Sequence, residues 1–291
     1  MDKLLYFAEA DGIAVEHMQR IGQFNMRVKH FHNEYEIFFI IDGERHFFLD
    51  NRAYFVKKGS LILVDENKIH MTKSVTEEDS GHERVILYVG KDKMRELDEK
   101  FPRINLVKFF RENYGIFHLN EDQQQQFLNM YHTLKKEFVH KKRNYKTMIE
   151  MEVIQYFVNF MRENYVEKLA QAGFDNNPKY RTVYAAADYI SENYTQKISL
   201  DELANQYYLS KYYFCRTFKE ITGYGISEYI NIHRIQKAKR LLEETDLTVS
   251  DIAHNLGYES LTHFEKVFKT YMTLSPLKYR KTLNIITYTN T

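Results

Sequence analysis

The chain has 291 residues, which at roughly 100–200 residues per domain predicts two domains. Hydrophobic residues make up 44% and charged residues 28%, as is ordinary for a protein with a buried core. The net charge is +1, but Tyr208–Lys281 holds 12 Lys+Arg against 8 Asp+Glu, which is compatible with a nucleic-acid partner without identifying one. One cysteine, Cys215, and no apolar run longer than Ile37–Ile41 exclude a disulfide scaffold, a cysteine-rich zinc module and a membrane protein. The start lacks a signal-peptide pattern, so we expect a soluble cytoplasmic protein.

Short strands are predicted along the first ~90 residues, because runs rich in Ile, Val, Phe and Tyr alternate with turn signals. The turn signals are Asp42-Gly43, Asp50-Asn51 and Gly59-Ser60. Such even spacing predicts a small antiparallel barrel or sandwich. The predicted strands are Glu36–Ile41, Arg45–Leu49, Ala53–Val56, Leu61–Val64 and Arg84–Val89.

A helical hairpin is predicted next, from apolar side chains at helical spacing in residues 122–138 and 146–164 with a basic turn, His140–Tyr145, between them. A stripe this apolar would otherwise face water, so we predict that the hairpin forms a homodimer interface. The alternative is that the hairpin belongs to the core alone. The candidate dimer contacts are Phe127, Tyr131, Leu134 and Phe157.

The clearest break in the chain lies near Pro178, which disfavours helix at the residue before it. Beyond this break the sequence is helical almost to its end. We therefore predict a strand-rich N-terminal domain, a helical dimerisation segment, a linker and a C-terminal helical domain. Their respective ranges are 1–100, 101–170, 171–180 and 181–285.

The C-terminal domain contains a repeat of about fifty residues, 200–222 and 249–272, and a repeat at fixed offset is a unit of structure. Each copy begins with a capping box, Ser199 with Glu202 and Thr248 with Asp251. Each continues with a short helix, a tight turn and a second helix whose N-cap is serine. The turn positions are Tyr208 and Gly257, the second N-caps are Ser210 and Ser260, and small alanines stand at Ala204 and Ala253. This layout predicts two helix-turn-helix motifs.

The second helix of each motif has one aromatic stripe for the core and one polar face. A helix in the major groove must present donors and acceptors to base edges and basic groups to phosphates. Arg216 suits bidentate pairing with guanine, and Glu265 can accept from cytosine. For one such helix the solvated face of an all-helical domain is the better interpretation, but two matched copies favour DNA. The candidate DNA contacts are Lys211, Tyr212, Cys215, Arg216 and Lys219 in the first copy, and Leu261, Thr262, Glu265, Lys266 and Lys269 in the second.

A helix of ~18 residues, Ser227–Glu244, is predicted between the copies and spans about 27 Å. Successive major-groove faces lie about 34 Å apart. This helix can therefore hold the two recognition helices in adjacent grooves of one duplex. A last helix is predicted to begin at Ser275-Pro276.

The run DIAHNLGYESLTHFEKVFKTYMTLSPLKYR resembles the C-terminal signature of AraC/XylS-type transcription regulators, and SLDELANQYYLSKYYFCRTFKEITG fits the same family. The resemblance covers about 100 residues, 183–282. Lys266, Thr273 and Gly225 depart from the usual pattern without removing a structural anchor. The resemblance implies an N-terminal effector and dimerisation region joined to the DNA-binding domain, with RNA polymerase as a further partner if the protein is an activator.

The N-terminal part is similar to cupin-type sensor domains, and the residues that carry this similarity are His30, His32, Glu36, Gly43, Gly59 and His70. Two imidazoles, a carboxylate and a fourth ligand suit a divalent metal. Family sensors often keep these residues without metal, so we predict no metal and no cofactor. We predict instead a small hydroxyl-rich effector, such as a sugar, inside the barrel. Its candidate contacts are His30, His32, Glu36, Phe38, His70 and Tyr88.

Two functions remain open at this point. The first is a ligand-responsive, sequence-specific transcription regulator with no enzymatic activity. The second is a cupin-type metalloenzyme with a helical appendage, which needs a bound metal with an open position. The enzyme does not explain the repeated helix-turn-helix motif, so we favour the regulator. We read Cys215 as a small residue packing near DNA; the alternative is a redox sensor.

Overall fold

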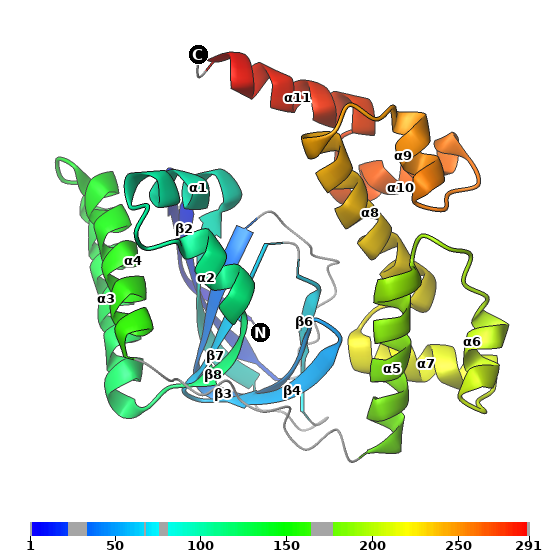
Figure 1. The fold of residues 1–291 in the computed structure, drawn as a ribbon. Coiled ribbons are helices and arrows are strands. Elements are labelled where there is room, and N and C mark those ends of the chain that lie inside the picture. The colour runs from blue at the N-terminus through cyan, green and yellow to red at the C-terminus, as the bar shows by residue number, and fades with distance from the viewer. Residues whose placement is uncertain (1, 23–33, 67, 76–80, 164–176, 290–291) are drawn as a thin grey trace. The chain divides into compact units, whose positions relative to one another are not determined.

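The computed structural model describes residues 2–22, 34–66, 68–75, 81–163 and 177–289. The chain divides into two compact units, Met1–Phe174 and Asp175–Thr291. The division lies inside the predicted linker, of which residues 171–176 lie outside the described residues. Figure 1 shows a first unit built from strands and helices and a second unit whose described elements are helices. No helix within these ranges is both long and apolar enough to cross a membrane.

An antiparallel sheet is the framework of the first unit, as the sequence predicts. Six strands pair in the order β1-β2-β7-β3-β5-β8, and β4 and β6 pair with the second half of β3. Pairing among the described strands therefore follows a path with two ends, not the closed ring of a complete barrel. The strands are β1 Lys3–Ala10, β2 Ile13–Ile21, β3 Glu34–Leu49, β4 Arg52–Lys57, β5 Ser60–Val64, β6 His70–Lys73, β7 Gly81–Gly90 and β8 Gly115–His118.

Strand β3 joins two strands that the sequence predicts as separate, so the predicted turn at Asp42-Gly43 is wrong. The register shifts between Ile40 and Asp42, and Gly43 has φ +83°. A Cβ at Gly43 would lie 2.5 Å from the carbonyl oxygen of Gly81, so only glycine permits this close approach. This bulge turns β3 from its pairing with β5 and β7 to its pairing with β4 and β6.

The predicted turn at Asp50-Asn51 is confirmed, because it joins β3 to β4. Asp50 and Asn51 have φ values of +45° and +70°, as a two-residue type I′ hairpin turn requires. Gly59, with φ +82°, turns the chain from β4 into β5. These turns fix which residues of each strand share a face.

The two faces of the sheet are covered differently. On β7, Val85 and Leu87 belong to the larger core cluster, which includes side chains of the helices, whereas Ile86 belongs to a second cluster between the two halves of β3. This alternation follows from the period of two in a strand. The second cluster is the inner face of the sheet, and its members are Phe38, Ile40, Phe47, Leu49, Val56, Ile62, Val64, Ile86 and Ile116.

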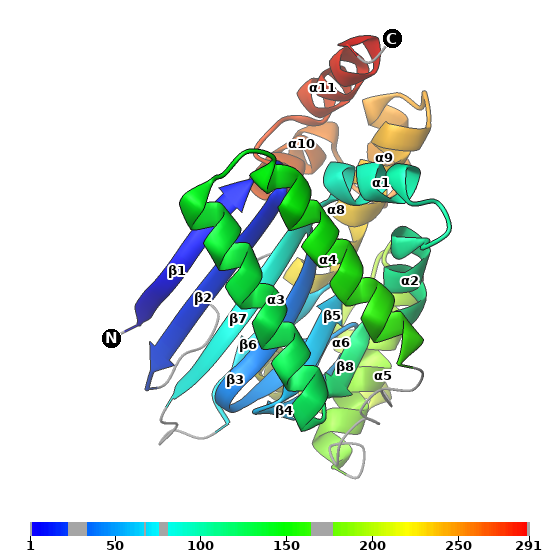
Figure 2. The ribbon, with the colours of Figure 1, turned by 90° about the vertical axis from the view of Figure 1, so that its left-hand side faces the viewer.

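Helices α3 and α4 confirm the predicted hairpin and lie across the outer face of the sheet in Figure 2. A capping box fixes the start of α3, because the Asn120 side chain accepts from the N–H of Gln123 and the Gln123 side chain accepts from the N–H of Asn120. Two further helices, which we did not predict, precede the hairpin. The helices of this unit are α1 Lys91–Lys100, α2 Leu106–Asn113, α3 Glu121–His140 and α4 Tyr145–Arg162.

The second unit is organised around α8, which contacts helices of both repeats. Buried aromatic residues form its core, among them Phe214, Phe218, Tyr229, Phe264 and Phe268. The helices are α5 Pro178–Asn193, α6 Leu200–Gln206, α7 Lys211–Thr222, α8 Ile226–Glu244, α9 Val249–Asn255, α10 Leu261–Met272 and α11 Pro276–Thr289. The predicted all-helical C-terminal domain with two helix-turn-helix motifs is confirmed.

Candidate functional site

The first helix-turn-helix motif consists of α6 and α7. Its two predicted N-caps are confirmed, since Ser199 Oγ accepts from the N–H of Glu202 at 3.3 Å and Ser210 Oγ accepts from the N–H of Tyr213 at 3.3 Å. The first cap is a simple N-cap and not the predicted capping box, because the described residues show no bond from the Glu202 carboxylate back to the N–H of Ser199. The turn between the helices contains Tyr208 with φ +55° and 98% exposure. A residue in this left-handed conformation carries strain unless it is glycine, but the open surroundings give the tyrosine side chain room.

The second motif consists of α9 and α10 and repeats this geometry. Thr248 Oγ1 accepts from the N–H of Asp251 at 3.1 Å and donates to the Asp251 carboxylate at 2.6 Å. Ser260 Oγ accepts from the N–H of His263 at 3.2 Å. Gly257 forms the turn with φ +77°, and a Cβ there would lie 2.1 Å from the carbonyl oxygen of Thr195. Glycine is therefore required at Gly257 for two separate reasons, conformation and space.

Arg234 on α8 holds this second turn in place. Its guanidinium donates to the carbonyl oxygens of Tyr194, Gln196 and Gly257 at 2.6, 2.9 and 2.9 Å. The same group lies 5.1 Å from the ring centre of Tyr258. Sequence reasoning missed Arg234, because its three acceptors lie far from it along the chain and carry no residue-type signal.

Helix α7 presents the predicted polar face to solvent, while Phe214 and Phe218 are fully buried beneath it. Among the described residues Arg216 has no ion-pair partner, so its guanidinium is available for an acceptor. Lys211 instead bonds the Asp201 carboxylate of α6 at 2.8 Å. Of the predicted contacts, Lys211, Tyr212, Arg216 and Lys219 are exposed and Cys215 is half-buried.

Helix α10 presents a matching face above buried Phe264 and Phe268. All five predicted contacts on it are exposed: Leu261, Thr262, Glu265, Lys266 and Lys269. The two recognition helices also expose Tyr213 and His263, which we did not predict as contacts. Both follow an N-cap by three residues, so their position in the repeat is the signal that was missed.

The predicted effector residues that the structure describes share the inner face of the sheet. Phe38 belongs to the inner cluster and Tyr88 packs against it. Glu36 and His70 pair with each other, with 3.2 Å between the carboxylate and Nε2, and His70 Nδ1 lies 2.9 Å from the carbonyl oxygen of Lys68. Burial opposes the charged form of His70, but the Glu36 carboxylate and the bond to Lys68 together raise the pKa of His70. His30 and His32 lie outside the described residues.

A group of three carboxylates, Asp11, Glu96 and Glu150, brings its oxygens within 4.8 Å of one another, which is a spacing that suits a metal ion. The ammonium of Lys93 already lies among them. It is 2.7 Å from Glu96 and 2.9 Å from Glu150, and it also bonds Asp11. This buried lysine supplies the positive charge that a metal would otherwise bring, and it ties α1 to α4 and to the turn between β1 and β2.

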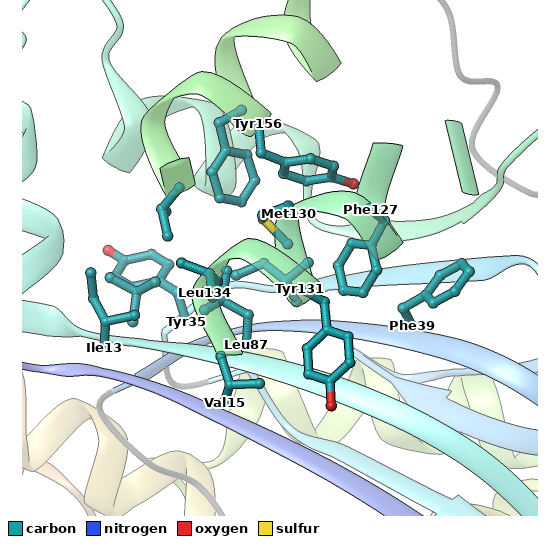
Figure 3. Close-up of a cluster of buried hydrophobic side chains, with 14 of the residues drawn as sticks. Ile13, Val15, Tyr35, Phe39, Leu87, Phe127, Met130, Tyr131, Leu134 and Tyr156 are labelled. Atoms are coloured by element: carbon teal, nitrogen blue, oxygen red, sulfur yellow. The ribbon is translucent and has the colours of Figure 1, made fainter. Parts of the chain in front are cut away.

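The four residues predicted at a dimer interface do not face solvent, so the prediction is wrong for these side chains. Phe127, Tyr131, Leu134 and Phe157 are between 0% and 2% exposed. They pack against Val15, Phe39 and Leu87 and their neighbours on the outer face of the sheet, and Figure 3 shows Phe127, Tyr131 and Leu134 in this core. The helical pattern shows that an apolar face exists, but the sheet of the same chain covers it.

Two family models match the chain. Residues 19–145 match an AraC-like ligand binding domain, and residues 203–282 match a helix-turn-helix domain. These matches fall one on each unit of the structure. The first includes the inner face of the sheet and all of α3. The second begins within α6 and includes the rest of the first helix-turn-helix motif and the whole of the second.

Several curated transcription regulators are also similar to this chain. The regulatory protein PocR of Salmonella typhimurium is 34% identical over 99 residues, which are 34% of this chain and 33% of PocR. The transcriptional activator AarP of Providencia stuartii is 38% identical over 92 residues, or 32% of this chain and 68% of AarP. The regulator YdeC of Bacillus subtilis, which is uncharacterized, is 24% identical over 255 residues, or 87% of this chain and 85% of YdeC.

The chain belongs to the AraC family of transcription regulators. Matches to several of its relatives, among them PocR and the Bacillus subtilis regulator YisR, span only about a third of the relatives' length. Family membership therefore establishes a ligand-binding domain and a helix-turn-helix domain. Which DNA sequence and which ligand this chain binds must be inferred from its own residues.

Proposed function

We propose that this protein is a sequence-specific DNA-binding transcription regulator whose activity responds to a small molecule bound in the N-terminal unit. The observation that carries the proposal is the pair of helix-turn-helix motifs with matched caps, turns and exposed faces. Two unrelated solvated helices have no reason to share left-handed turns at an offset of 49 residues, Tyr208 and Gly257. Two recognition helices on one scaffold account for this duplication.

The length of α8 supports binding to adjacent grooves. Its 19 residues span about 28 Å, which is near the ~34 Å between successive major-groove faces. The exposed guanidinium of Arg216 is suited to a guanine, and the exposed carboxylate of Glu265 is suited to a cytosine amine. Lys219 and Lys269 stand near the ends of the two helices, where a phosphate is the expected acceptor.

A gel shift and footprint test this part of the proposal. The DNA is the promoter region beside the gene, with an unrelated fragment of equal length as competitor. We expect a protected region that covers two successive major grooves. Equal binding to both fragments at every salt concentration would refute sequence-specific recognition.

The effector that we propose is a small hydroxyl-bearing molecule, such as a sugar or a related metabolite, on the inner face of the sheet. Glu36, His70 and Tyr88 supply polar groups there, and Phe38 supplies an aromatic wall. His30 and His32 stay part of the proposal from the sequence alone. A ligand that binds the folded form raises the melting temperature by mass action, so a thermal-shift screen with sugars and metabolites is the test.

We further propose that the protein is a cytoplasmic homodimer and, if it is an activator, that it contacts RNA polymerase. Support for a dimer comes from apolar side chains that the α3–α4 hairpin leaves exposed, namely Val139, Met148 and Met151. Sedimentation of the full chain and of the variant Met151→Glu tests this surface. A monomer at tens of micromolar would refute the dimer.

The metalloenzyme alternative is not favoured. Its ligand set needs Glu36 and His70 free for a metal, and these two residues bond each other. Metal analysis of the purified protein, together with the gel shift, separates the two functions. A stoichiometric divalent metal combined with no DNA binding would support the enzyme.

A further inference from the structure

One end of the inner face of the sheet is basic instead of apolar. His82 and Arg84 lie on β7, two residues apart, and so share a face with Ile86 of the inner cluster. Arg45 lies on β3, two residues beyond Gly43, and Gly43 is the register partner of His82. We call Arg45, His82 and Arg84 the basic end.

All three side chains of the basic end are buried. Arg45 is 0% exposed, His82 4% and Arg84 7%. Arg45 Nε donates to Thr72 Oγ1 at 3.2 Å and its Nη1 donates to Ser74 Oγ at 3.0 Å. These hydroxyls orient the guanidinium of Arg45 within the basic end.

The hydrogen-bond donors of the Arg84 guanidinium are only partly satisfied. Its Nη2 lies 2.9 Å from the Glu16 carboxylate, and its guanidinium lies 5.0 Å from the ring centre of Phe38. Its Nη1 is buried and has no hydrogen-bond partner among the described residues. Buried guanidinium groups are normally fully bonded, so this N–H is placed to donate to a group from outside the chain.

His82 also has buried polar atoms without a hydrogen-bond partner. Both of its ring nitrogens are buried, and neither has a partner in the described part of the chain. Burial, together with the charges of Arg45, Arg84 and Arg20, lowers the pKa of His82 to about 3. The imidazole is therefore neutral at physiological pH, and one ring nitrogen carries a hydrogen that it can donate.

We propose that the basic end binds the acidic group of the effector, a carboxylate or a phosphate, and that Arg84 Nη1 and a ring N–H of His82 donate to it. This inference rests on the proposed function, since it names the class of effector for the same inner face. A sugar hydroxyl can satisfy a donor, but a guanidinium N–H forms its strongest hydrogen bonds with carboxylate and phosphate oxygens. An acidic sugar derivative therefore fits this face better than a neutral sugar.

The rest of the inner face suits the remainder of such a ligand. The Glu36–His70 pair lies four residues from Ile40, the register partner of Arg84, or about 13 Å along β3. Phe38 and Ile86 lie between the two polar ends. The acidic group and the hydroxyl-bearing body of one molecule would thus meet different parts of this face.

The test is thermal shift and calorimetric titration of the full chain with D-gluconate, D-glucose 6-phosphate, inorganic phosphate and D-glucose. All titrations use a phosphate-free buffer at matched ionic strength. The test variants are Arg84→Gln and His82→Gln, and Arg95→Gln is the matched control, because Arg95 is an exposed arginine on α1. A cooperative thermal unfolding transition of each variant in the absence of ligand establishes that the first unit, which contains all three substitutions, is folded.

We expect at least one of the three anions to raise the melting temperature and D-glucose to have no effect. Arg84→Gln should weaken that anion about tenfold, or about 1.4 kcal/mol, while Arg95→Gln should leave it unchanged. The inference is overturned if no anion binds, if D-glucose binds as well as D-gluconate, or if Arg84→Gln and His82→Gln both bind the anion normally. A gluconate response without a phosphate response assigns a carboxylate, and the reverse pattern assigns a phosphate.

The proposed regulator function and the proposed anion site can be refuted independently of each other. If a neutral sugar alters operator binding and no anion does, the effector-responsive regulator stands and the anion site does not. If the full chain binds no operator with or without ligand, the proposed function fails whatever the anion titration gives.

Discussion

Gly257→Ala is the substitution whose effect the structure defines most closely. Gly257 has φ +77°, a conformation that costs an alanine about 1–2 kcal/mol. The new Cβ would also lie 2.1 Å from the carbonyl oxygen of Thr195, so one of the two segments must move by more than about 1 Å.

That movement is resisted, because Arg234 binds Gly257 and the segment around Thr195 through three carbonyl oxygens. Overpacking of this kind costs about 1–3 kcal/mol. Together with the backbone term we expect the second motif to lose about 2–5 kcal/mol of local stability. A loss of this size should open α9 and α10 and weaken operator binding.

Native-state hydrogen exchange at the amides of α9 and α10 measures this free energy directly. The matched control is Gly225→Ala, since Gly225 has φ −68° and a Cβ there would meet nothing within 4 Å. As an N-cap substitution it should cost less than about 1 kcal/mol. Equal exchange in the two variants would refute the steric argument.

The equivalent turn of the first motif gives the opposite expectation. Tyr208 has φ +55° but is almost fully exposed, so its side chain meets no obstacle. Tyr208→Gly should relieve backbone strain and raise the local stability of α6 and α7 by about 0.5–1 kcal/mol, after the entropy cost of glycine is subtracted. Slower exchange at these helices is the expected result, and faster exchange would contradict it.

Four further outcomes follow from single residues. Arg216→Ala should weaken operator binding by about 1–3 kcal/mol and relax selectivity at one base pair, as a selection from randomised sites would show. Lys269→Ala should weaken binding to all sequences alike and reduce the slope of log K against log salt by about one. Phe127→Ala should destabilise the first unit by about 3–5 kcal/mol in urea unfolding without a specific loss of self-association, because Phe127 is buried against the sheet. Burial raises the pKa of Asp65 to about 6, so its folded form favours the protonated carboxyl, and this contribution is present below about pH 4 and lost as pH rises toward 6. Asp65→Asn should therefore stabilise the first unit by about 1–3 kcal/mol at pH 7 and have little effect at pH 4.

Each of these outcomes can be contradicted by one measurement. Unchanged operator selectivity in Arg216→Ala would show that this face of α7 does not read bases, and a sequence-dependent loss in Lys269→Ala would exclude a simple phosphate contact. A folded Phe127→Ala monomer formed from a wild-type dimer would restore the dimer role of this helix. Equal stabilisation by Asp65→Asn at both pH values would remove the titration argument.

The sequence determined the features that depend on neighbours along the chain. The repeat at an offset of 49–50 residues, the serine and threonine caps and the 3.6-residue period of Phe214 and Phe218 were sufficient to predict both helix-turn-helix motifs and their exposed faces. The type I′ turn at Asp50-Asn51 could be predicted from the sequence for the same reason. Caps, turns and amphipathic faces are short-range physics, and the residue types that satisfy them are few.

Tertiary structure decided what covers each apolar face and which distant side chains meet. The apolar stripe of α3 with Phe127 and Leu134 suited a partner or the core equally well, and only the sheet packed against it excluded the partner. Gly43 reads as a hairpin turn in the sequence, but the close approach of Gly81 makes it a bulge in a continuous strand.

The inner face follows the same rule. Glu36 and His70 were identified as polar groups for a ligand, while their bond to each other appears only once β3 and β6 are paired. The buried group of Arg45, His82 and Arg84 has no sequence motif at all, because two strands that are distant in the sequence, β3 and β7, bring it together. A period of two or 3.6 residues predicts which side chains point into the interior. Only the tertiary fold determines which residues those side chains contact there.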